Sequence, residues 1–138
     1  MKSEPYKYSF SQLKKDGQTL WDGVRNYTAR NHLNSMKLGD ICLFYHSNEG
    51  LEIVGSAIVT KTAEPDLTVT PEKLTKDGKN PWVVVTVAPH ETFKKTFTLQ
   101  QAKQDKNLQN MALLKYGRLS VQPVTPDEYT YILEKTKA

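Results

Sequence analysis

The apolar positions of the chain recur with two periods, one typical of helices and one typical of strands. Ala29, Leu33 and Met36 stand at i, i+4 and i+7, which predicts a helix from about Asn26 to Met36 with one buried stripe. Runs rich in apolar and β-branched residues predict strands at Ile41–His46, Leu51–Thr60 and Trp82–Val87. The four polar or small residues between the first two runs suit a hairpin.

Capping signals locate further elements. Ser9 is placed to cap a short helix that ends at Gly17. Thr125, Pro126 and Glu128 form a capping box with proline at the first helical position, and they predict a terminal helix up to Thr136. We expect one or two short helices within Thr98–Tyr116 and a further strand at Arg118–Val124.

The segment from Thr62 to Pro81 has no clear periodicity, and it carries three prolines and a glycine. Such a long loop in a compact domain usually indicates a functional flap or an unrecognised element. The order of elements is mixed α and β. It favours a small β-barrel with peripheral helices, an α+β fold, over a parallel sheet with crossovers. With 138 residues, we expect a single domain over residues 1–138.

Composition narrows the functional classes only slightly. A net charge of +4 permits weak contact with phosphates without requiring it. The single cysteine, Cys42, allows no intramolecular disulfide, and its apolar neighbours are typical of an inert buried thiol. No apolar stretch is long enough to span a bilayer, and the start lacks the pattern of a secretory signal. We therefore expect no membrane association and a cytoplasmic protein, nuclear in a eukaryote.

Arginine is rare in this chain, which draws attention to the positions where it occurs. Its planar donor group is preferred where a phosphate, a carboxylate or a base edge must be bound. Asn26 and Arg30 lie four residues apart beside the apolar stripe, where their helix would meet the barrel. Taken alone, Arg30 is better explained by a structural ion pair with Asp22 or Asp40. Among nineteen basic residues the arginines are Arg25, Arg30 and Arg118.

A set of motifs along the whole chain resembles the EVE domain family. The motifs are Lys2-Ser3-Glu4-Pro5, Trp21-Asp22-Gly23-Val24-Arg25-Asn26-Tyr27 with Ala29-Arg30-Asn31, Met36–Asp40, Phe44–Ser47 and Arg118–Pro123. The long string that begins at Trp21 is specific, whereas the short motifs alone are weak. The resemblance implies a PUA-like barrel distantly related to YTH domains. It also implies binding of 5-methylcytosine or its oxidised forms in DNA, without catalytic turnover.

The same residues have the chemistry of a base pocket. A base that leaves the stack costs a few kcal/mol, and stacking on an aromatic ring returns roughly 1–3 kcal/mol. Aromatic candidates are Trp21, Tyr45 and Tyr27; candidates for the base edge are Ser3, Asn26 and His46; phosphate candidates are Lys2, Arg25 and Arg30. We expect one concave pocket formed by Ser3, Trp21, Asn26, Arg30, Tyr45 and His46, with Tyr27 beside it.

Structural roles compete with several of these assignments. Trp21 is also suited to the core, and Trp82 is assigned to the core because it begins the strongest strand. His46 ends an apolar strand and can be a satisfied core histidine, while Arg118 and Gln122 can tie the last strand to the barrel. The first strand is expected to be short or at an edge.

The leading interpretation is a non-catalytic, monomeric module that binds nucleic acid, with modified DNA favoured and RNA possible. It needs no cofactor and no metal, and a separate effector protein can act with it. One alternative is an RNA-binding PUA-like domain. Another is a hydrolase acting on a modified nucleoside, for which Lys2 and Glu4 would form the catalytic pair.

Overall fold

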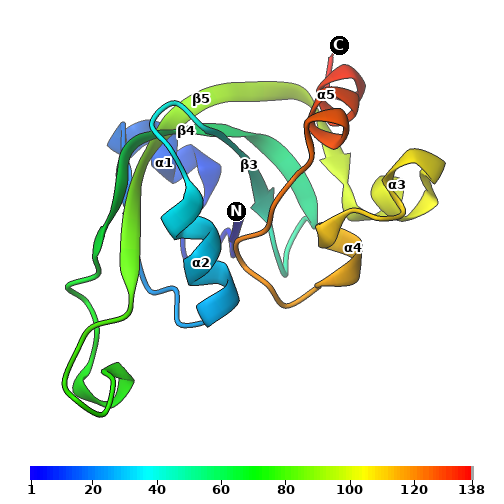
Figure 1. The fold of residues 1–138 in the computed structure, drawn as a ribbon. Helices are drawn as coiled ribbons and strands as arrows, with labels where there is room; N and C mark the ends of the chain where they lie inside the picture. Colours follow the sequence, from blue (N-terminus) through cyan, green and yellow to red (C-terminus); the bar gives the residue numbers. More distant parts are fainter. Residues whose placement is uncertain (138) are drawn as a thin grey trace.

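Two long antiparallel strands form the spine of the structure, a computed structural model that describes residues 1–137 (Figure 1). Strand β4 (Glu52–Pro65) pairs with β5 (Val83–Thr98), and the pairing shifts register at four points. Such irregularities bend a strand and increase its twist. The two strands accordingly curve around one side of the molecule in Figure 1.

Three shorter strands complete a single sheet in the order β1-β3-β4-β5-β2. Strand β3 (Ile41–His46) pairs antiparallel with β4, which confirms the predicted hairpin. Strand β2 (Thr19–Trp21) pairs antiparallel with β5, and β1 (Lys2–Ser3) lies parallel to β3. The first strand is therefore short and at an edge, as predicted.

The mixed fold agrees with the predicted small β-barrel only in part, because the sheet stays open. Closure would require the edge strands β1 and β2 to hydrogen-bond with each other, with consistent tilt and stagger. These strands have only two and three residues, and they do not pair. The predicted mixed α and β composition is confirmed, but the two edge strands do not pair.

The helices begin and end close to the predicted residues. Ser9 caps α1 (Phe10–Asp16), Asn26 caps α2 (Tyr27–Ser35), and Thr125 forms the capping box of α5 (Pro126–Lys135). Between β5 and α5 lie α3 (Leu99–Gln104), the 3-10 turn η2 (Lys106–Leu108) and α4 (Ala112–Lys115). None of the helices described within residues 1–137 combines the length and the apolar character that a membrane span requires.

The segment Arg118–Val124 is irregular, which corrects the prediction of a strand there. It runs beside β1, where the Lys2 N–H donates to the Ser120 carbonyl at 2.9 Å. Strand β1 is too short to support a further ladder, since strand pairing gains stability from successive cross-strand contacts. The segment nevertheless brings Ser120 to the edge of the sheet.

Two apolar clusters lie on opposite faces of the sheet, because successive residues of a strand point to opposite sides. Phe44 belongs to the cluster that includes Leu13, Leu33 and Val85. Tyr45 belongs to the second cluster, whose buried members include Ile53, Phe97, Leu108 and Ile132. Helices α1 and α2 and the segment Arg118–Val124 contribute to the first cluster, and α3, η2, α4 and α5 contribute to the second.

The loop between β4 and β5 extends away from the sheet at the lower left of Figure 1 and contains an unpredicted 3-10 turn, η1 (Pro71–Lys73). Trp82 is 4% exposed, which confirms its assignment to the core. Its indole N–H donates to the Lys73 carbonyl at 2.8 Å. The Asn80 amide donates to the Asp66 carbonyl at 2.8 Å, so the base of the loop is held by internal hydrogen bonds.

A fully buried carboxylate connects this loop to the turn after β2. Asp66 accepts from the Arg25 guanidinium at 2.8 Å and from the Gly23 N–H at 3.0 Å. Its other oxygen accepts from the backbone and hydroxyl groups of Thr68. Burial alone would raise the pKa of Asp66, but the hydrogen bonds from Thr68, Arg25 and Gly23 outweigh it and lower the pKa from 3.8 to about 2.

We predict that Asp66→Asn lowers the free energy of unfolding by about 3 kcal/mol, because it removes the counter-charge of a largely buried arginine. Urea unfolding at neutral pH measures this effect. Asp77→Asn is the matched control, since Asp77 is an exposed carboxylate of the same loop. Its replacement is expected to change stability by no more than about 0.5 kcal/mol. Equal losses in the two variants would contradict the prediction.

The same variant has a pH signature. The folded-state pKa of Asp66 lies below the ordinary value, so its contribution to stability is complete above pH 3.8 and is lost as the pH falls towards about 2. Unfolding curves of the wild type should therefore show this loss of stability. The loss should be smaller in Asp66→Asn, and Asp77→Asn should retain it.

Candidate functional site

A pocket of about 510 Å³ lies between the two edge strands that fail to pair. Strand β1 contributes Lys2 and Ser3, and β2 contributes Trp21 together with its two preceding residues. The turn held by Asp66 forms a further wall, and Ser120 lines the pocket from the irregular segment. The volume falls within the range of about 300–1,000 Å³ typical of small-ligand sites.

Trp21 has both of the roles that the sequence allowed, packing on the core and lining the pocket. It is half-buried, and its ring meets Phe44 edge to face, with centroids 5.6 Å apart and planes at 86°. Tyr8 meets the same indole at 6.4 Å, also edge to face. Trp21 therefore packs on the core beneath β2 and lines the pocket. Edge-to-face packing of this kind fixes the orientation of the ring.

Two hydrogen-bond acceptors come from the first motif. The Ser3 hydroxyl donates to the Tyr8 carbonyl, which leaves its oxygen free to accept a hydrogen bond from a ligand. The Glu4 oxygen Oε2 is shielded from solvent and accepts no hydrogen bond within residues 1–137, although the Lys7 ammonium lies 3.4 Å away. Neighbouring Tyr6 and Lys7 hold the pKa of the Glu4 carboxyl below its usual value, so it is ionised and can only accept.

The two predicted phosphate-binding residues that line the pocket have partners within the chain. The Lys2 ammonium donates to the Gly117 carbonyl at 2.7 Å, and burial lowers its pKa. Arg25 donates to Asp66 and reaches the Thr68 hydroxyl at 3.3 Å. Lys2 and Glu4 have different partners, Gly117 and Lys7, so they do not form the hydrogen-bonded pair that the hydrolase alternative would favour.

Tyr45 and His46 do not line this pocket, in contrast to the expected convergence. Tyr45 is 6% exposed and packs in the cluster on the opposite face from Phe44 and Trp21. The His46 ring accepts the Phe10 N–H at 3.1 Å through Nε2, and burial lowers its pKa. His46 is thus a neutral, satisfied histidine that caps the start of α1, which was the structural alternative.

Asn26, Tyr27 and Arg30 lie outside this pocket as well. The Asn26 side-chain oxygen caps α2 by accepting from the Ala29 N–H at 3.0 Å. Tyr27 packs on Trp82 with ring centroids 4.8 Å apart, and the Arg30 guanidinium lies 4.9 Å from the Tyr27 ring. Arg30 also donates to Asn31 and to the Pro81 carbonyl. These side chains serve the helix start and the base of the β4–β5 loop.

Several residues of the site were not predicted from the sequence. The pocket is lined additionally by Lys7, Tyr8, Thr19, Leu20, Asp22, Gly23, Val24 and Ser120, and by Glu4, which was named only for the hydrolase alternative. Glu4, Asp22, Gly23, Val24 and Ser120 fall within the motifs quoted for the family, which was the available signal. Nothing in the local sequence distinguishes Asp66, the residue that holds one wall in place.

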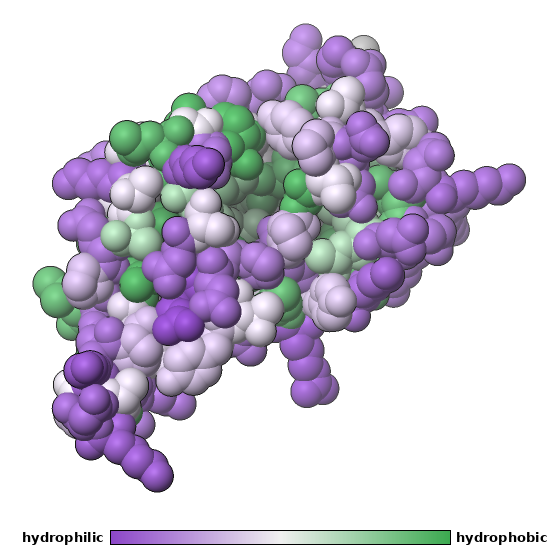
Figure 2. All heavy atoms as spheres, in the orientation of Figure 1, coloured by the Kyte–Doolittle hydropathy of each residue, from purple (hydrophilic) through white to green (hydrophobic). Residues whose placement is uncertain are grey.

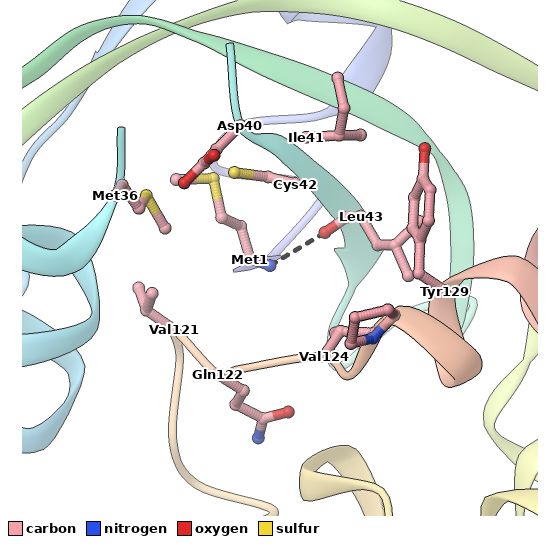
Figure 3. A pocket seen from close by; sticks show the side chains of 11 residues that line it. Met1, Met36, Asp40, Ile41, Cys42, Leu43, Val121, Gln122, Val124 and Tyr129 are labelled. Carbon is pink, nitrogen blue, oxygen red and sulfur yellow. Dashed lines mark hydrogen bonds between the residues drawn. The ribbon is translucent and has the colours of Figure 1, made fainter. Parts of the chain in front are cut away.

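A second cavity, of about 420 Å³, is lined by residues of β3 and by the start of α5 and is drawn in Figure 3. Figure 2 shows apolar surface around a hollow on this face, beside α2. Met1, Met36, Cys42 and Val121 lie around the cavity, and the Met1 amine donates to the Leu43 carbonyl at 2.9 Å. Burial raises the pKa of the Cys42 thiol, which matches the inert role expected of it. None of the predicted site residues lines this cavity.

Comparison with known proteins agrees with the fold and with the motifs. The EVE domain family matches residues 1–135. Human thymocyte nuclear protein 1 is 35% identical over 159 residues, which cover 96% of this chain and 71% of that protein. A protein of known structure from Leishmania major is 42% identical, with a TM-score of 0.91 and coverage of 99% of this chain and 91% of that one.

A further solved structure is that of human THYN1 protein in complex with DNA containing 5-methylcytosine. It superimposes on this chain with a TM-score of 0.91 and 34% identity, and the match covers 100% of this chain and 96% of that one. Sequence motifs, fold and relatives agree over nearly the whole length, and the chain belongs to the EVE domain family.

Proposed function

We propose that this chain binds DNA that carries a modified cytosine and takes the modified base, flipped out of the stack, into the pocket between β1 and β2. The observation that carries this proposal is the presence of an oriented tryptophan and two hydrogen-bond acceptors in one pocket, at Trp21, Ser3 and Glu4. Binding occurs without turnover, and any downstream effect arises from occupancy or from a separate effector protein.

The acceptors match the hydrogen-bonding edge of cytosine. The exocyclic amino group of cytosine is a donor, and carboxylates are its usual partners in proteins. The Ser3 hydroxyl oxygen has acceptor capacity that the described residues do not use, and Glu4 Oε2 accepts no hydrogen bond from them, although the Lys7 ammonium forms an ion pair with it at 3.4 Å. A donor of the ligand that reaches Glu4 Oε2 would form a charge-assisted hydrogen bond, which is stronger than one between neutral groups.

Discrimination of the methyl group needs apolar surface. Val24 is 7% exposed and lines the same pocket as Trp21. One additional methyl or methylene group in an apolar pocket is worth about 1–3 kcal/mol, or about 10- to 200-fold in affinity. We therefore place the expected preference for methylated over unmodified cytosine within this range.

The DNA complex of the human relative supports the choice of ligand class, because the two chains share the whole fold at 34% identity. The names of the curated vertebrate relatives also place those proteins in the nucleus. We propose that this chain likewise acts where DNA is found, in the nucleus of a eukaryote or in the cytoplasm of a bacterium.

A binding screen tests the proposal directly. Fluorescence anisotropy compares DNA and RNA oligonucleotides of one sequence that contain cytosine, 5-methylcytosine or oxidised 5-methylcytosine. We expect tighter binding to modified DNA than to unmodified DNA. Mass spectrometry of the oligonucleotides after incubation should show unchanged masses. Equal affinity for modified and unmodified strands would overturn the modified-base assignment, preference for RNA would overturn the DNA assignment, and a mass change would reveal catalysis.

A substitution at Trp21 tests the pocket itself. Trp21→Leu keeps an apolar side chain against Phe44 but removes the aromatic plane, so affinity for modified DNA should fall by about 5- to 150-fold. Trp21→Phe should restore part of this loss. Thermal unfolding monitors the fold in parallel, because Trp21 also packs on the core.

Tyr27→Leu is the matched control, since Tyr27 is an exposed aromatic residue outside the pocket. It should leave affinity for modified DNA close to that of the wild type. A folded Trp21→Leu protein that binds as well as the control would rule out this pocket.

A further inference from the structure

A third cavity, of about 700 Å³, is lined by residues adjacent in sequence to those of the proposed base pocket, and it is called the hollow below. The two are adjacent along two segments: Arg25 lines the pocket and Asn26 lines the hollow, while Ser120 lines the pocket and Leu119 lines the hollow. The Lys2 ammonium joins them, because Lys2 lines the pocket and donates to the carbonyl of Gly117 in the hollow. The two cavities are therefore lined by residues that are neighbours in the chain at both segments.

Arg118 lines this hollow with its guanidinium uncommitted. Arg25 is held by Asp66, and Arg30 is held by Asn31 and the Pro81 carbonyl. Within residues 1–137, the Arg118 side chain forms no ion pair and no hydrogen bond, and the residue is exposed. A planar group with five donors and no partner is well suited to bind a phosphate. Of the three arginines, Arg118 is therefore the one available to a ligand.

Tyr116 gives the hollow an aromatic surface. It is 58% exposed and belongs to neither apolar cluster. Exposed aromatic rings in basic grooves stack on bases that are not paired in a duplex. The residues that line the hollow include His32 and Pro123 but no carboxylate, so an anionic strand meets no like charge there.

We propose that this hollow binds the nucleotide that flanks the modified base, with Arg118 on its phosphate and Tyr116 stacked on its base. The proposal rests on the proposed function, because the flank is defined by the base held in the pocket between β1 and β2. It assigns to Arg118 the phosphate contact that was expected of Arg25 and Arg30. It also makes the protein bind a short single-stranded stretch rather than an isolated base.

The test compares a ligand that has flanking nucleotides with one that has none. The first ligand is 5-methyl-2′-deoxycytidine 5′-monophosphate, and the second is a short single-stranded DNA with the same base in its middle. Titration calorimetry measures both on the wild type, Arg118→Gln and Tyr116→Ala. Lys115→Gln is the matched control, because Lys115 is an exposed cation close to Arg118 in sequence that does not line the hollow.

We expect the wild type to bind the short strand more tightly than the mononucleotide. Tyr116→Ala should weaken strand binding by about 5- to 150-fold, the loss expected for one stacked base. Arg118→Gln should reduce the slope of log K against log salt by about 0.7, the value for one phosphate of a single strand. Both variants should bind the mononucleotide as the wild type does, and Arg118→Lys should keep the salt slope.

The outcomes separate the two proposals. If the wild type binds neither ligand, the base pocket fails and the assignment of the flank fails with it. If the wild type binds both ligands but Arg118→Gln and Tyr116→Ala behave like Lys115→Gln on the strand, the pocket stands and the hollow is not the flanking site. Equal losses on mononucleotide and strand would likewise overturn the assignment of these two residues to the flank.

Discussion

The wall of the candidate site depends on one buried carboxylate that does not line it. Asp66 ties the Gly23 backbone and the Arg25 guanidinium, which belong to the pocket, to the base of the β4–β5 loop. The turn after β2 has no regular secondary structure of its own, so without this anchor its position would be poorly defined. Because the partners of Asp66 are hydrogen-bonded to its ionised form, the anchor is strong at neutral pH. The same interaction explains why a conspicuous arginine in the longest motif is not free to bind a phosphate.

The pocket exists because the sheet does not close. In a closed barrel the two edge strands, β1 and β2, would pair with each other. A ladder of hydrogen bonds would then fill the space between Ser3 and Trp21. Here the edges have two and three residues, and the chain leaves both strands early to form the turns that line the opening. Short edge strands protect a sheet against unwanted pairing with other chains. In this fold the same shortness leaves room for a ligand.

Local signals in the sequence predicted most of the elements, and they failed where long-range geometry decides. Ser9, Asn26 and Thr125 cap helices as expected, since a cap depends on residues only three positions apart. The placement of Tyr45 could not be predicted in this way, because the face on which it lies depends on the register of β3 against its neighbours. Asp66 pairs with a residue 41 positions away and carries no local pattern. The family motifs found Lys2, Ser3, Trp21 and Arg25, but they did not separate residues that line the pocket from residues that support it.

The bends in β4 and β5 have a consequence for how members of this fold can diverge. The wall formed by β1 reaches β4 through β3, and the wall formed by β2 is attached to β5, so the curvature of the two long strands sets the aperture between the walls. That curvature comes from irregular positions such as the shift between Ile53 and Gly55, far from the opening along the chain. Gain or loss of one such position would widen or narrow the aperture while every residue that touches the ligand stayed the same. Ligand size can therefore evolve through the backbone of the spine, independently of the side chains of the site.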